Sequence, residues 1–123
     1  MQPPVSVDFA QLDWQAHPSI AGIQTKFVQN DSPFPPIDLL IATVAAGGEI
    51  PWHVHESDSE LAYVLQGEGI LRYSADESHE NAAEIPLPTG SAVIVPPSVW
   101  HHVQNTGGVD LLLFASHIRQ HDT

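Results

Sequence analysis

A pair of histidines with a glutamate shortly after them restricts the possible folds of this chain more than any other pattern in it. His53 and His55 are separated by one residue, so in an extended strand their side chains point to the same face. Glu60 opens an apolar run, residues 61–65, after a polar, turn-like segment at residues 56–59. A strand, a turn and a second strand would return the carboxylate towards the two imidazoles. Two imidazoles and one carboxylate on adjoining strands are the ligands of a three-point metal site with open coordination positions.

The spacing around these residues resembles two motifs of the cupin family. The first motif is matched by the pattern Gly47-x5-His53-x-His55-x4-Glu60-x6-Gly67. The second is matched by the pattern Gly90-x5-Pro96-x-Ser98-x2-His101-x3-Asn105. Ser98 stands where the family usually has glycine, which would serve a backbone conformation that serine adopts less easily. The chain is therefore identified as a small single-domain member of the cupin superfamily that carries both motifs.

This resemblance implies a fold and a metal site. The fold is all-β, a double-stranded β-helix (jelly-roll) cupin barrel with little helix. The resemblance further implies that one divalent metal is held jointly by four side chains, namely His53, His55, Glu60 and His101. Three imidazole nitrogens and one carboxylate oxygen are compatible with Fe(II), Mn(II), Ni(II), Co(II), Cu(II) or Zn(II), and the ligand set does not select among them.

Two classes of function are open to such a site. Four protein ligands on an octahedral metal leave two positions for water, a bidentate substrate, or substrate and dioxygen, and a metal so placed can act as a Lewis acid or acidify water. The resemblance implies a metal-dependent enzyme acting on a small molecule, with a dioxygenase-like oxidoreductase as the first prediction and an isomerase or lyase as alternatives. The other class is a non-catalytic cupin that binds or senses a small ligand, because a fold and its ligands do not determine a function. No catalytic residue beyond the metal ligands is predicted.

Composition sets outer limits on size and partners. The chain has 123 residues, enough for one domain with a core. Three basic residues against 15 acidic ones give a net charge of −12, which argues against nucleic acid or an anionic membrane as a partner. There are no cysteines, so disulfides and thiolate chemistry are excluded. The amino-terminal residues lack the basic and apolar regions of a signal peptide, and we expect a cytoplasmic protein.

Apolar runs and turn signals divide the chain into three parts. We expect an N-terminal arm at residues 1–22, a barrel domain at 23–118 and a C-terminal tail at 119–123. Phe9 and Trp14 of the arm should pack on the barrel exterior or on a second subunit. Tight turns are expected at 30–33 and 67–69, and an acidic surface loop at 75–84. Strands are expected at residues 23–29, 37–45, 61–65, 70–74, 91–95, 101–104 and 109–116.

Further residues near the motifs have competing interpretations. Either Arg72 or its neighbour Tyr73 faces inwards to contact substrate, depending on the register across the turn at 67–69, which is unknown. His102 alternates with His101 and should lie on the outer surface rather than act as a fifth ligand. Four histidines have no ligand spacing and are read as structural or surface residues: His17, His79, His117 and His121. Three apolar residues flank the ligands on the opposite face and suit a homodimer interface: Trp52, Val54 and Trp100.

Overall fold

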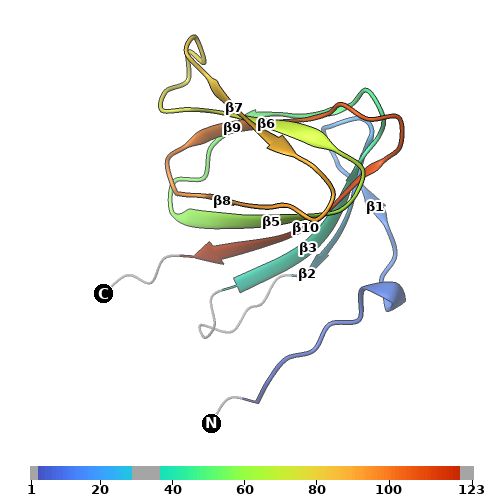
Figure 1. The fold of residues 1–123 in the computed structure, drawn as a ribbon. Helices are drawn as coiled ribbons and strands as arrows, with labels where there is room; N and C mark the ends of the chain where they lie inside the picture. The colour runs from blue at the N-terminus through green and yellow to red at the C-terminus, as the bar shows by residue number, and fades with distance from the viewer. Residues whose placement is uncertain (1–2, 29–36, 120–123) are drawn as a thin grey trace.

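The computed structural model describes residues 3–28 and 37–119, and within them it is built from antiparallel strands and one short 3-10 turn (Figure 1). The elements are η1 (Phe9–Gln11), β1 (Gln15–Ala16), β2 (Ile23–Val28), β3 (Ile37–Val44), β4 (Glu49–His53), β5 (Asp58–Gln66), β6 (Gly69–Ser74), β7 (Ala83–Leu87), β8 (Ala92–Val95), β9 (Trp100–Asn105) and β10 (Leu111–Arg119). They form a six-stranded sheet in the order β1-β2-β3-β10-β5-β8 and a four-stranded sheet in the order β4-β9-β6-β7. Figure 1 shows the two sheets as facing layers. The all-β jelly-roll prediction is confirmed.

Alternation along the last strand shows how the core is made. β10 lies between β3 and β5, and its residues Leu111, Leu113 and Ala115 are buried on the inner face. Two residues further along the same face comes His117, which is only half-buried. Because side chains alternate with period two, the inner face of this strand has aliphatic side chains at one end and an imidazole at the other. The inner face of the sheet therefore changes from apolar to polar along the strand direction.

The N-terminal arm covers part of the outer face of the six-stranded sheet. The ring of Phe9 packs edge-on against Phe114 of β10, with 6.1 Å between ring centroids. Lys26 Nζ of β2 donates a hydrogen bond to the carbonyl oxygen of Phe9 at 2.8 Å and lies 4.9 Å from the ring centroid of Trp14. The arm also adds β1 to the edge of the sheet beside β2. Phe9 thus packs on the barrel exterior, one of the two expected positions.

The short turn between β5 and β6 requires glycine on both sides of Glu68. Gly67 has a φ of +83°, in the left-handed region, and a Cβ there would lie 2.9 Å from the carbonyl oxygen of Asp110. A Cβ on Gly69 would lie 2.5 Å from the carbonyl oxygen of Gln104. The tight reversal expected at residues 67–69 is confirmed, and the last glycine of the first motif is explained by close backbone packing.

Three local expectations differ from the structure. The segment at residues 83–87, which contains Pro86 without a backbone donor, was not among the expected strands. It forms a strand at the edge of its sheet, where a residue without a donor is tolerated. β4 ends at His53, so His55 lies in the loop after the strand rather than within it. β10 runs to Arg119, one residue into the expected tail. The turn expected at 30–33, and the tail residues 120–123 with His121, lie outside the described residues.

Candidate metal centre

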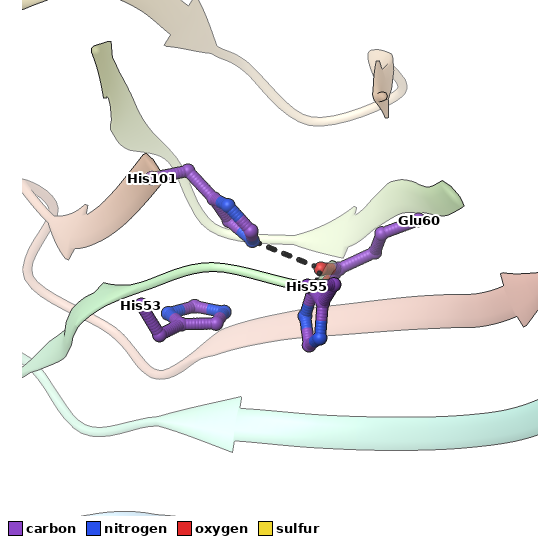
Figure 2. Close-up of side chains that lie close together, drawn as sticks. All are labelled: His53, His55, Glu60 and His101. Atoms are coloured by element: carbon purple, nitrogen blue, oxygen red, sulfur yellow. Dashed lines mark hydrogen bonds and ion pairs between the residues drawn. The ribbon is translucent and has the colours of Figure 1, made fainter. Parts of the chain in front are cut away.

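Four side chains from both sheets meet at one end of the barrel interior. His53 ends β4 and is the cross-strand neighbour of His101 in β9, both in the four-stranded sheet. Glu60 comes from β5 in the opposite sheet, and His55 from the loop that joins the two sheets. One potential ligand atom from each of the four lies within 4.8 Å of the others. Figure 2 shows the four side chains turned towards a common point.

The backbone orients two of the imidazoles for coordination. Nδ1 of His53 lies 2.8 Å from the carbonyl oxygen of Pro51, and Nδ1 of His101 lies 2.9 Å from that of Val99. A carbonyl oxygen only accepts hydrogen bonds, so each Nδ1 carries the proton and donates it. The lone pair of each Nε2 is then directed into the cluster. A hydrogen bond from the distal ring nitrogen to a carbonyl is the usual support of a metal-bound histidine.

Glu60 needs a positive partner in this arrangement. Its Oε2 lies 3.1 Å from Nε2 of His101 and 3.3 Å from Nε2 of His55. If Nδ1 of His101 holds the single proton of a neutral ring, Nε2 and the carboxylate oxygen are both acceptors and repel each other. The Nε2 atom of His55 is buried and, despite its distance from Glu60, makes no aligned hydrogen bond. Either an added proton or a metal ion would relieve both contacts, and three nitrogens with one carboxylate oxygen fit a divalent transition metal.

The electrostatics agree with an anionic carboxylate among imidazoles. Burial alone would raise the pKa of Glu60, but the close contacts with the imidazoles of His101 and His55 hold that pKa well below its usual range. The contact with Glu60 raises the pKa of His55. Burial lowers the pKa of His53. Glu60 is therefore charged inside the barrel, where a positive partner is needed.

A fifth polar side chain, His117, stands beside the cluster. It is the cross-strand partner of Glu60 in β10, and its Nε2 lies 3.9 Å from Oε2 of that residue. The centroid of its ring is 5.0 Å from that of His55. His117, interpreted from the sequence as a structural or surface residue, is outside the group of four potential ligands but lies next to it. Leu111 and Leu113 face inwards, and the same alternation along β10 predicts that His117 also faces inwards. Nothing in the sequence, however, predicts that His117 lies beside Glu60.

The cluster opens into a cavity of about 430 Å³ between the sheets. All four clustered residues and His117 line it, and His17 and Ile20 of the arm contribute to its wall. The rest of the lining is mostly aliphatic and comes from both sheets, including Leu40, Val64, Leu71, Val103 and Leu113. The size is within the range of small-molecule sites.

The strand register separates Arg72 from Tyr73. Arg72 faces outwards, and its Nε donates a hydrogen bond of 3.0 Å to Oε1 of Glu84 on β7. Tyr73 is the cross-strand neighbour of His101, but its residue is 39% exposed and lines a separate small hollow with Ile85 and Val99. Neither residue is part of the lining of the cavity beside the cluster.

The outward-facing aromatic residues lie beneath the loop after β6. His102 faces away from the cluster as expected. However, it is not a surface residue, because it is only 5% exposed and its ring lies 5.5 Å from that of Trp52. Its Nε2 lies 3.1 Å from Oε2 of Glu49. The ring of His79 stacks on Trp52 with 3.9 Å between centroids and approaches Trp100 at 5.6 Å. Trp52 and Trp100 thus pack outside the barrel, within a cluster of their own chain's residues.

Comparison with protein families decides the classification. A family model described as "Cupin domain" matches residues 40–117. The chain belongs to the cupin family. This match covers the whole candidate site from His53 to His117.

Individual relatives of this cupin are more distant. It is 30% identical over 69 residues to the oxalate-binding protein of Thermotoga maritima, covering 56% of this chain and 51% of the relative. It is 37% identical over 79 residues to auxin-binding protein 1 of Arabidopsis thaliana, covering 61% of this chain and 38% of the relative. The matches therefore cover only about half of the first relative and less than half of the second. Among solved structures, the Cnp3 cupin domain of Schizosaccharomyces pombe superimposes with a TM-score of 0.75 at 16% identity, covering 94% of this chain and 74% of that one. At that identity the similarity shows the fold alone.

Across the described segments, no helix has the length and apolar character needed to span a bilayer.

Proposed function

We propose that this cupin is a metal-dependent enzyme that acts on a small molecule at one divalent transition metal. The ligands are His53, His55, Glu60 and His101. The observation that carries this proposal is the contact of His101 Nε2 with the Glu60 carboxylate at 3.1 Å, while Nδ1 of the same ring faces a carbonyl oxygen. Two acceptors so placed need an added proton or a metal ion, and the four potential ligand atoms within 4.8 Å of one another support the metal.

The residues around the metal have separate tasks. Glu60 supplies a negative charge that partly neutralises a divalent ion, and the backbone carbonyls at Pro51 and Val99 keep two imidazoles oriented. The metal, when bound, would supply Lewis acidity and, if it is iron or copper, a centre that can activate dioxygen. His117 offers a polar contact to a bound molecule beside Glu60. The aliphatic wall excludes water from the side of the cavity away from the ligands. Within this proposal a dioxygenase-like oxidoreductase is the first candidate, as the resemblance implies, with an isomerase or lyase as other reactions of the same site.

A non-catalytic binding protein is the second candidate. Two relatives are named for binding, one for oxalate and one for auxin, and both match less than two thirds of this chain. The same metal and cavity would then hold a ligand without turnover. Tight binding of one compound with no product, under every metal loading tested, would favour this candidate over the enzyme.

The metal proposal is tested by elemental analysis of purified protein. The wild type should hold about one metal ion per chain, and His55→Ala should lose most of it. His79→Ala is the matched control, because His79 stacks on Trp52 outside the barrel. Equal metal content in wild type and His55→Ala would refute the ligand set. Turnover is then sought with diols, catechols, thiols and ketoses at defined Fe, Mn, Ni or Zn loading, with oxygen consumption followed.

We further propose that two copies associate through the outer face of the six-stranded sheet. Two neighbouring strands of this sheet expose large apolar side chains, with Ile94 of β8 70% exposed and Tyr63 of β5 41% exposed. Large exposed apolar side chains on adjacent strands suit an interface between protein chains. Trp52 and Trp100, which with Val54 were expected in a homodimer interface, lie on the four-stranded sheet and contact His79. Sedimentation should give a dimer for the wild type and a monomer for Ile94→Glu. A monomeric wild type would refute the association.

A further inference from the structure

We propose that the cavity selects a ligand with one metal-coordinating polar head and an uncharged, apolar body, and that it discriminates against a second charged group on that body. The claim about the metal-coordinating head rests on the proposed metal function. The claim about the apolar body rests only on the residues that line the cavity. An experiment can therefore refute either claim while the other stands.

The charge distribution supports discrimination against a second anion. The chain has three basic residues, and all three lie in the described segments and are engaged elsewhere. Lys26 bonds to the arm, Arg72 to Glu84 on the outer face, and Arg119 to Asp38. Of the described residues that line the cavity, none is a lysine or arginine. A carboxylate held away from the metal would therefore be buried without a lysine or arginine partner, which is costly, and the net charge of −12 would repel it further.

The wall beyond the ligands is aliphatic. Leu40 and Ala42 of β3, Val93 of β8 and Leu87 of β7 all line the cavity, so both sheets contribute apolar surface. A ligand consisting of a polar head alone would leave these walls in contact with water. An apolar body that covers them would gain binding free energy in proportion to its buried area.

The polar groups away from the cluster are few and uncharged. Thr25 offers a hydroxyl from β2. His17 accepts hydrogen bonds at Nδ1 from the backbone N–H groups of Ser19 and Ile20, both at 3.2 Å. A ring that accepts at Nδ1 is neutral and carries its proton at Nε2. His17 is thus a neutral donor, suited to a hydroxyl or carbonyl on the ligand body rather than to a counter-ion.

The first experiment keeps the head constant and changes the body. Zinc-loaded wild-type protein is titrated calorimetrically with pyruvate, 2-oxobutanoate, 2-oxohexanoate and 2-oxoadipate, which share one bidentate head. Each added methylene should tighten binding about fourfold, so 2-oxohexanoate should bind about 60-fold more tightly than pyruvate. 2-Oxoadipate, which has a carboxylate in place of the terminal methyl group, should bind at least about tenfold more weakly than 2-oxohexanoate. Equal or tighter binding of 2-oxoadipate, or no dependence on chain length, would overturn the proposal.

A pair of charge variants tests the same idea by gain of function. Thr25→Lys places a cation in the cavity wall, and Gln24→Lys places the same charge on the exposed, opposite face of β2. Thr25→Lys should tighten 2-oxoadipate binding about tenfold or more, and Gln24→Lys should leave it unchanged. If both variants changed the affinity for 2-oxoadipate equally, the proposal of an uncharged cavity wall would be contradicted. Folding of both is checked by circular dichroism, and the wild-type series decides the question if Thr25→Lys does not fold.

A metal-free arm separates this proposal from the proposed function. If the protein holds no zinc and binds none of the 2-oxo acids, the metal site is refuted. The wall is then tested on the same metal-free protein with 1-hexanol and 6-hydroxyhexanoate. Binding of 1-hexanol at least about tenfold tighter than 6-hydroxyhexanoate would support the apolar cavity. The reverse order would overturn it.

Discussion

Asn105, the last residue of the second motif, should be a major source of stability because it joins the two sheets. It lies in β9 of the four-stranded sheet and is only 3% exposed. Its Nδ2 donates to the carbonyl oxygen of Val44 in β3 at 2.9 Å and to that of Val109 at 2.8 Å. Its Oδ1 accepts from the backbone N–H of Gly107 at 2.9 Å. One side chain thus ties the turn after β9 to the opposite sheet.

The expected cost of Asn105→Ala follows from these three bonds. The carbonyl of Val44 belongs to a fully buried residue, and leaving it unpaired costs roughly 1–3 kcal/mol. The other two bonds lie nearer to solvent and contribute about 0.5–1.5 kcal/mol each. We therefore expect a loss of about 3 kcal/mol in the free energy of unfolding. This corresponds to a fall in Tm of about 10 °C for a domain of this size.

The assay is urea unfolding followed by tryptophan fluorescence, with thermal unfolding as a second measurement. The matched control is Gln66→Ala, which removes an amide whose Nε2 makes one exposed hydrogen bond of 3.2 Å to the carbonyl oxygen of Asp110. That variant should lose no more than about 0.5 kcal/mol. If Asn105→Ala lost less than about 1 kcal/mol, or no more than Gln66→Ala, the reasoning that Asn105 closes the barrel would be refuted.

Three further predictions concern the site and its supporting turn. His117→Ala should weaken metal binding about tenfold, as measured by chelator competition, because His117 supports Glu60 without being a ligand; unchanged affinity would contradict this. Ser98→Gly should raise the free energy of unfolding by up to about 1 kcal/mol, because Ser98 has a φ of 67°; a decrease would show that the strain is absent. In metal-free protein, an added proton on an imidazole takes the place of the metal as the positive partner of the carboxylate, as the raised pKa of His55 indicates, so Glu60→Gln should be less stable than wild type at neutral pH. Because the pKa of Glu60 is lowered on folding, this difference should shrink as pH falls below the ordinary value of 4.5; a gap that does not vary with pH would count against the ionised carboxylate.

The resemblance carried by the two motifs predicted the fold class and four of the five polar residues that meet at the site. The two motifs identified the residues that meet in the structure, and the period of two in β10 indicated which side chains face inwards. The reasoning about Ser98 was also sound. The structure places this residue in the left-handed region, where its N–H donates to the carbonyl oxygen of His55 at 2.8 Å. These features are local, or fixed by a family pattern, so one chain is enough to find them. The homodimer and the cytoplasmic location stay predictions.

Pairing between distant strands was decided only by the tertiary structure. The register of β6 against β9 turned Arg72 outwards, and the register of β10 against β5 brought His117 beside Glu60. Residues 83–87 form a strand because β7 lies at a sheet edge, where Pro86 needs no backbone donor. The local sequence around Pro86 does not show that the strand lies at an edge. The uncharged cavity wall likewise depends on where Lys26, Arg72 and Arg119 find their partners. The physical reason is that a strand's own sequence determines which residues share a face. Which other face it meets is set by turns and pairings far along the chain.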